Sequence, residues 1–170
     1  MRKFFVIFIL FVFVLFFPQK IHSKVLNGGI SVTDMVPTGF FGAWKVVAVQ
    51  VTTTNSEMFA PYSVEMWNLF KSGDVITLEN PVSGASASIT VKDATENTFT
   101  FQRITGDSSE KVTETATLTL SGDNFYGYDT MSVKYYKNGK LLKEEYVKYK
   151  LKAAKISGDK LWRIFGVNNY

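Results

Sequence analysis

The fold of this chain is decided by residues 40–51, which read FFGAWKVVAVQV. Gly42 stands two residues before Trp44, so the backbone can turn tightly and then place a large indole at the start of an extended segment. An almost unbroken apolar run follows the tryptophan, and it contains no turn residue. We therefore predict a long β-strand over residues 43–53, with the indole at its mouth.

Short segments of alternating apolar and polar residues continue along the chain, and turn residues separate them. No segment has the period of a convincing amphipathic helix. The pattern predicts an all-β domain, an eight-stranded antiparallel up-and-down barrel with a short closing strand, and a two-sheet β-sandwich is the alternative. Hairpin connections throughout favour the barrel, because closure removes the sheet edges. The later strands are predicted at residues 64–70, 75–79, 85–92, 98–103 and 111–120, in a long hairpin around 137–140, and at 161–165.

The alternation also assigns residues to the inside of the barrel. Small inward residues such as Ala85 and Ala87 stand opposite aromatic residues such as Phe99 and Tyr135. One interpretation is a recessed wall that leaves room for an apolar ligand, and the other is alternate large and small packing in a filled core. The candidate cavity lining consists of Ala85, Ala87, Ile89, Phe99, Phe101, Arg103, Glu114, Ala116, Leu118, Met131, Val133, Tyr135 and Tyr149.

Two of these inward positions are charged. Arg103 follows Phe101 in phase, and Glu114 lies between Val112 and Ala116. If the hairpin pairs Arg103 with Val112, Glu114 lies diagonally from Arg103 and faces Phe101. In one interpretation the guanidinium binds the carboxylate of a ligand. In the other the two side chains form an ion pair at a wet end of the barrel, worth under about 1 kcal/mol.

The last hairpin turns at residues 137–140, which read KNGK. Asn-Gly is typical of a two-residue turn, but that register would send Val147 to the face opposite Met131. A three-residue loop with Gly139 in a left-handed bulge restores a common face, so we predict this loop. A bulge at Glu144-Glu145 is the alternative.

Residues 1–23 have the pattern of a signal peptide, with a basic start and an apolar core at residues 4–17. The core has 14 residues, which is short of the ~20 that span a bilayer as a helix. We expect cleavage after Ser23 and no stable membrane anchor afterwards, and an uncleaved anchor is the alternative. The mature protein would be secreted or periplasmic, with a lead-in segment at residues 24–39 and one barrel domain at residues 40–170.

Charge is distributed unevenly along the chain. Residues 1–23 hold three of the 19 basic residues and none of the 15 acidic ones. Residues 24–129 hold 6 basic and 12 acidic residues, whereas residues 130–170 hold 10 basic and 3 acidic residues. Nucleic acid or a membrane surface could use such a basic end, but the lysines alternate with core residues instead of clustering. We interpret them as the solvent face of the last strands, where lysine prevents edge pairing, and we expect no nucleic-acid partner.

The residue types of the mature chain exclude several classes of chemistry. The single histidine, His22, lies in the leader, and the chain has no cysteine. Ser–His and Cys–His nucleophilic sites, His or Cys zinc sites and histidine-ligated haem are therefore excluded. An enzyme built on two carboxylates remains an alternative, but the acidic residues stand mostly in turns. We predict a protein that is not an enzyme, with no catalytic residue, metal or cofactor.

The segment at residues 40–47 resembles the Gly-x-Trp opening of lipocalins and of lipocalin-like domains of secreted bacterial proteins. The resemblance implies an eight-stranded barrel with Gly42 and Trp44 at its closed end. It also implies that an arginine of the final strand region, here Arg163, packs across the indole, which would be a cation–π contact. We predict a secreted binding protein for a small hydrophobic molecule in a barrel cavity. A structural or adhesive domain with a filled core, acting through its surface, is the alternative.

Overall fold

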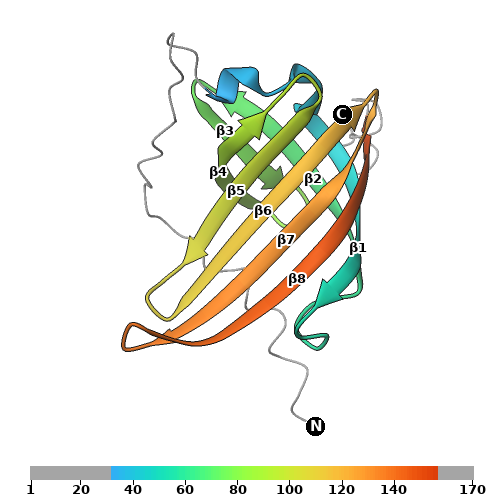
Figure 1. The fold of residues 1–170 in the computed structure, drawn as a ribbon. Helices are drawn as coiled ribbons and strands as arrows, with labels where there is room; N and C mark the ends of the chain where they lie inside the picture. Colours follow the sequence, from blue (N-terminus) through green and yellow to red (C-terminus); the bar gives the residue numbers. More distant parts are fainter. Residues whose placement is uncertain (1–31, 157–170) are drawn as a thin grey trace, which may run out of the picture.

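The computed structural model describes residues 32–156, and these residues form a closed barrel of eight antiparallel strands (Figure 1). Each strand pairs with the next along the chain, and the last pairs back with the first, so the barrel leaves no sheet edge. This confirms the predicted up-and-down barrel and rules out the sandwich, whereas the predicted closing strand at residues 161–165 lies outside the described residues. The strands are β1 (Gly42–Thr53), β2 (Tyr62–Ser72), β3 (Val75–Asn80), β4 (Ala85–Ala94), β5 (Thr98–Gly106), β6 (Glu110–Ser121), β7 (Asn124–Lys137) and β8 (Lys140–Lys155).

The two ends of the barrel are built differently. At one end, which we call the η end, two short 3-10 helices, η1 (Val32–Met35) and η2 (Thr38–Phe40), lie near the β2–β3, β4–β5 and β6–β7 hairpins (Figure 1). At the other, the loop end, the β1–β2 connection at residues 54–61 lies on the same side as the remaining three hairpins. No helix among the described residues is long and apolar enough to cross a membrane.

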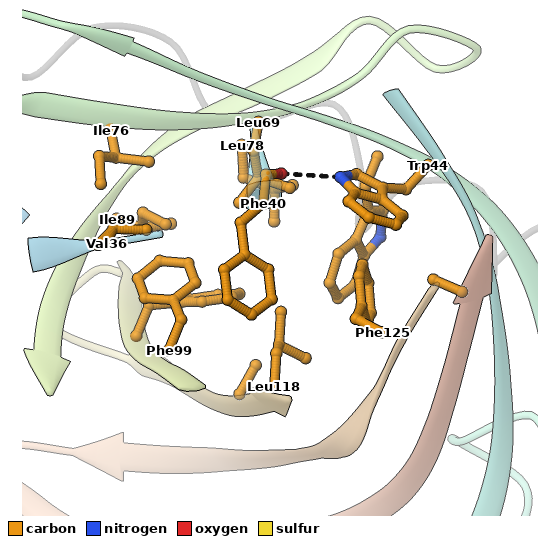
Figure 2. Packing of buried hydrophobic residues seen from close by; sticks show 14 of the residues in the cluster. Val36, Phe40, Trp44, Leu69, Ile76, Leu78, Ile89, Phe99, Leu118 and Phe125 are labelled. Carbon is orange, nitrogen blue, oxygen red and sulfur yellow. Dashed lines mark hydrogen bonds between the residues drawn. The ribbon is translucent and has the colours of Figure 1, made fainter. Parts of the chain in front are cut away.

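Aromatic side chains fill the η end (Figure 2). Trp44, Phe40, Phe99 and Phe125 are all fully buried, and the rings of Trp44 and Phe125 have their centroids 4.9 Å apart. The indole Nε1–H of Trp44 donates a hydrogen bond to the carbonyl oxygen of Phe40 at 2.8 Å. This bond fastens η2 to β1, so the indole joins the helical cover to the barrel wall.

A lysine packs on the indole from the last described strand. Lys155 Nζ lies 5.3 Å from the centroid of the Trp44 ring and donates to the carbonyl oxygen of Gly39 at 2.9 Å. Such an ammonium over a tryptophan face is a cation–π contact. Arg163, to which the resemblance to lipocalins assigned this role, lies outside the described residues.

The turn of the β7–β8 hairpin differs from the predicted three-residue loop. Asn138 and Gly139 have φ values of 53° and 75°, and the flanking lysines pair directly, so the turn has two residues and not the predicted three. The register then shifts by one residue at Leu142, an exposed bulge that restores a common inward face to the two strands. Asn-Gly accepts positive φ at both positions, which favours the tight turn. The compensation therefore comes from a bulge, but at Leu142 instead of Glu144-Glu145.

Candidate functional site

A layer of polar side chains crosses the barrel interior between two apolar clusters. The larger cluster fills the η end, and the smaller one, around buried Phe59, Val133 and Val147, lies at the loop end. On six strands, the first inward residue beyond the larger cluster in the direction of the loop end is polar or amphipathic. We call these side chains the polar layer: Gln50 on β1, Glu65 on β2, Arg103 on β5, Glu114 on β6, Asp129 on β7 and Tyr149 on β8.

The two charged residues that the sequence singled out form an ion pair within this layer. Arg103 pairs with Glu114 directly across β5 and β6, and its Nε donates to Glu114 Oε2 at 2.7 Å, with a second contact from Nη2. Val112 pairs with Thr105 and not with Arg103, the pairing considered from the sequence, because the β5–β6 turn is centred one residue later and pairs Gly106 with Lys111. The Glu114 side chain is only 5% exposed and that of Arg103 is 29% exposed, so the pair lies inside the barrel instead of at a wet end.

Asp129 is the least satisfied member of the layer. The residue is 7% exposed, and its Oδ1 is buried without a hydrogen-bond partner. Burial raises the pKa of Asp129 well above its ordinary value, and the neighbouring charges of Glu114 and Glu65 add to this increase. Arg103 and the backbone N–H of Thr130 lower the pKa, but they do not outweigh the burial. The carboxyl is therefore held toward its protonated form in the folded protein.

This raised pKa makes stability depend on pH in a defined direction. A carboxyl whose folded-state pKa exceeds its unfolded value of about 3.9 stabilises the fold fully below that pH, and the contribution is lost as pH rises through the folded-state pKa. Asp129→Asn has the shape of the protonated acid at every pH. We expect the free energy of unfolding of the wild type to fall relative to that of the variant between pH 5 and pH 8, as measured by urea denaturation. A difference that stays constant over this range would contradict the raised pKa.

Two carboxyls of the layer, Asp129 and Glu65, were not predicted from the sequence. Asp129 is in phase with Met131 and Val133 on β7, and this alternation is the signal that could have placed it inward. Glu65 accepts hydrogen bonds from Trp67 Nε1 and Ser63 Oγ, each at 3.0 Å. The alternation that places both residues inward can be read from the sequence, but the convergence of six strands on one layer depends on barrel closure.

The residues predicted to line a cavity fall into three groups. Five belong to the packed cluster of the η end: Ile89, Phe99, Phe101, Ala116 and Leu118. Three lie in or against the loop-end cluster: Met131, Val133 and Tyr135. The remaining five lie at or near the level of the polar layer: Ala85, Ala87, Arg103, Glu114 and Tyr149.

On the wall formed by β3 and β4, inward-facing residues beside the polar layer are only partly buried. Ala85 and Ala87 alternate with exposed Ser86 and Ser88, so they point inward, yet both remain partly exposed. The paired β3 residue Asn80 is also only half-buried. Solvent thus reaches inward-facing small residues on this side of the barrel.

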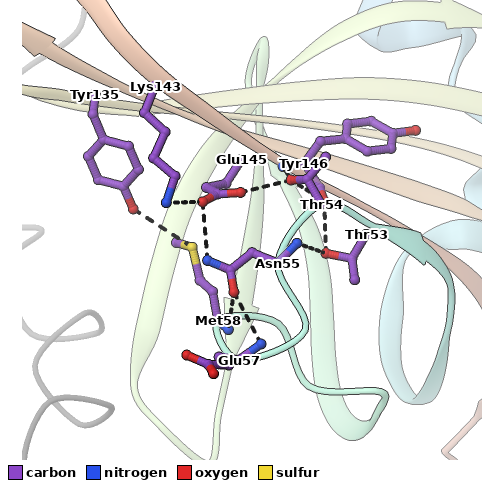
Figure 3. Close-up of polar contacts among 9 residues, drawn as sticks. All are labelled: Thr53, Thr54, Asn55, Glu57, Met58, Tyr135, Lys143, Glu145 and Tyr146. Atoms are coloured by element: carbon purple, nitrogen blue, oxygen red, sulfur yellow. Dashed lines mark hydrogen bonds and ion pairs between the residues drawn. The ribbon is translucent and has the colours of Figure 1, made fainter.

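A hydrogen-bonded loop covers part of the loop end (Figure 3). Asn55 Oδ1 accepts the backbone N–H groups of Glu57 and Met58, both at 3.1 Å, while Asn55 Nδ2 donates to Glu145 Oε1 at 3.1 Å. These hydrogen bonds hold the loop in the conformation in which Phe59 is buried in the loop-end cluster. The β1–β2 connection is therefore folded over the barrel interior instead of projecting from it.

The carboxylate that anchors this loop is kept ionised. A hydrogen bond from Lys143 and another from Thr54 Oγ1 lower the pKa of Glu145 below its ordinary value. The hydrogen bond between Lys143 and Glu145 also raises the pKa of Lys143. Near neutral pH both groups are charged, so this anchor of the loop remains intact.

The polar layer contains the Arg103–Glu114 ion pair and the Oδ1 atom of Asp129, which has no hydrogen-bond partner. Small inward residues of β4 lie beside it. Within residues 32–156, no group of three or more Asp, Glu, His or Cys side chains is arranged to hold a metal ion. Few polar groups above an apolar floor are typical of sites that orient one end of a small molecule. No protein-family model, curated protein or solved structure matches the chain, so its own residues are the basis for any functional interpretation.

Proposed function

We propose that this protein is a lipocalin-like barrel that binds a small hydrophobic molecule without transforming it, in a secreted or periplasmic setting. The observation that supports binding is the partial exposure of Ala85 and Ala87, which point into a closed barrel. A barrel of eight strands is just wide enough for side chains to fill it or for one small ligand to replace some of them. Small inward residues that solvent reaches favour the second arrangement.

The apolar surfaces of the interior suit a ligand of this kind. The η-end cluster supplies a rigid aromatic floor that includes Phe101, and the loop-end cluster supplies half-buried Met131 and Tyr135. A hydrophobic ligand that enters beside β4 would contact these surfaces and displace water from them. Its polar end would meet the polar layer.

Binding without chemistry is the proposal that the residue types favour. The mature chain contains no histidine or cysteine. The Arg103 guanidinium is engaged by Glu114, so this pair offers neither a free base nor a free anion-binding group. The signal-peptide pattern of residues 1–23 supports export.

A bulky side chain at Ala87 should compete with the ligand. N-Phenyl-1-naphthylamine, a neutral fluorescent lipophile, is expected to bind the wild type, and Ala87→Phe to weaken that binding by about tenfold or more, which corresponds to 1.4 kcal/mol. Ser88→Phe is the matched control, because Ser88 is the exposed neighbour on the same strand. It should leave the affinity within about twofold. Equal effects of both variants would show that the probe does not enter the barrel.

Native mass spectrometry and solvent extraction of the purified protein test the proposal without a chosen probe. A co-purifying lipophile supports it, and an empty spectrum together with no probe binding would contradict it.

The alternative, a domain that acts through its surface, is favoured by a specific feature. Val49, Val51, Tyr62 and Val64 are exposed on β1 and β2, and Val49 pairs with Tyr62. Exposed apolar groups that adjoin one another are typical of contact surfaces. This alternative would gain support if nothing enters the barrel while the η end remains folded.

A further inference from the structure

We propose that the ligand carries a positively charged amine, and that Asp129 in the barrel interior is the residue that receives it. The inference rests on the proposed function, because it names the chemistry of the molecule that the barrel would bind. Three features support it: the position of Asp129, the charges around it and the accessible wall beside the layer.

The position of Asp129 leaves one acceptor without a donor. Its Oδ1 is buried without a hydrogen-bond partner among the described residues, and the side chain faces the interior in phase with buried Phe125 and Val133. A buried polar atom without a partner is costly and rare in folded proteins. An N–H donor from a ligand would satisfy it.

The charges around Asp129 favour a cation. Glu65 from β2 and Glu114 from β6 both lie close enough to raise its pKa, and Tyr149, its cross-strand partner on β8, contributes no positive charge. The one cation of the layer, Arg103 from β5, already binds Glu114 through two nitrogens. Three carboxyls therefore share one guanidinium. Burial of Asp129, and after it the negative charges of Glu114 and Glu65, raise the pKa of Asp129 and favour its protonated form when the site is empty.

An ammonium group can take the place of that proton. It would supply both the missing charge and the missing hydrogen-bond donors, and the proton of Asp129 would leave to solvent as the amine enters. A carboxylate ligand would instead add a fourth acidic group next to an arginine that is already paired. The layer thus discriminates by charge, while the apolar surfaces above and below it accept the rest of the molecule.

The route to the layer is compatible with such a ligand. Ala85 and Ala87, which have no polar side chains, are the partly exposed inward residues of β4 at this level of the barrel. Half-buried Asn80 on β3 pairs with Ala85. The methylene chain of a ligand could lie against these residues, because neither alanine has a polar side chain that the chain would separate from water.

Three ligands of equal chain length test the charge preference: octylamine, 1-octanol and octanoate, each titrated by calorimetry into the wild type, Asp129→Asn and Glu96→Gln. Glu96 is an exposed carboxylate at the η end, so Glu96→Gln makes the same carboxyl-to-amide substitution far from the layer. We expect the wild type to bind octylamine about tenfold or more tightly than 1-octanol and to bind octanoate weakest. Asp129→Asn should reduce the amine preference to below about threefold, and Glu96→Gln should leave it unchanged.

Proton release gives a second readout that needs no variant. Titration of octylamine in buffers of different ionisation enthalpy should show release of up to about one proton per bound amine, with more release at pH 5 than at pH 8. 1-Octanol should release none.

The possible results separate this inference from the proposed function. If N-phenyl-1-naphthylamine binds but octylamine shows neither preference nor proton release, the inference is overturned and a hydrophobic binding site remains. An amine preference that persists in Asp129→Asn also overturns it, because another group would then be the receptor. If none of the four molecules binds, the proposed function fails and the inference fails with it.

Discussion

Replacing Trp44 by alanine is expected to lower the free energy of unfolding by about 3–5 kcal/mol, the usual range for removing a fully buried large aromatic side chain. The indole is 0% exposed, packs on Phe125 and holds η2 through its hydrogen bond to the Phe40 carbonyl oxygen. Its loss would leave a large void at the η end and free the helical cover. Denaturant unfolding, followed by far-UV circular dichroism, measures this loss.

A conservative variant separates packing from the hydrogen bond. Trp44→Phe keeps an aromatic ring in the cluster but removes the indole N–H, so the buried oxygen of Phe40 loses its donor at a cost of about 1–3 kcal/mol. We expect it to be less destabilising than Trp44→Ala. A loss below about 1 kcal/mol for the alanine variant would mean that the indole is not the plug of this end.

Alanine at Gly127 is expected to cost about 3 kcal/mol, the upper range for forcing extra atoms into a packed structure. Gly127 lies on β7 opposite Leu118, where a Cβ atom would overlap the backbone carbonyl oxygen of Thr117 and lie 3.0 Å from Leu118 Cα. Backbone atoms cannot rotate away as a side chain can, so β6 and β7 would have to separate beside the polar layer. Urea denaturation at pH 7 measures the effect.

Gly122, in the turn that joins the same two strands, is the control. A Cβ there would meet nothing within 4 Å, but its φ of +58° is unfavourable for alanine. Gly122→Ala should therefore cost only about 1–2 kcal/mol, through the backbone alone. If Gly127→Ala is no more destabilising than Gly122→Ala, the close approach of β6 and β7 is not a requirement of the fold.

Stability and the proposed binding have different locations in this barrel. The η end is a filled aromatic core, and buried apolar area there stabilises the fold whether or not a ligand is present. The polar layer and the β3–β4 wall retain half-buried side chains and an acceptor without a partner. We infer that variants in the layer will alter ligand preference more than they alter folding, whereas variants at Trp44 will do the reverse.

Much of the fold could be predicted from local patterns. The alternation on β4, β5 and β6 is a property of consecutive residues, so Phe99, Phe101 and Leu118 were assigned inward, and all three are fully buried. The order of strands followed from short connections, which favour pairing between neighbours. The candidate site was less accessible to prediction: Arg103 and Glu114 were found by their phase, but their register was two residues in error.

Register could not be predicted because it depends on small features of loops and bulges. At the β5–β6 turn, Asp107 Oδ1 accepts the N–H groups of Ser109 and Glu110, and the turn is centred one residue later than in the pairing considered from the sequence. In the last hairpin, the exposed bulge at Leu142 absorbs the residue that the tight Asn-Gly turn leaves over. One residue more or less in a loop changes every partner along a ladder.

The sequence by itself determined which residues face inward, because side chains of an extended chain alternate with a period of two whatever the strand's partner. It also determined the lack of histidine and cysteine outside residues 1–23. Only the tertiary structure decided that Glu65, Arg103, Glu114 and Asp129 converge on one layer and that Arg103 is already paired with Glu114. The physical reason is that charge balance and hydrogen-bond satisfaction depend on neighbours from distant strands, and closure of the barrel brings those strands together.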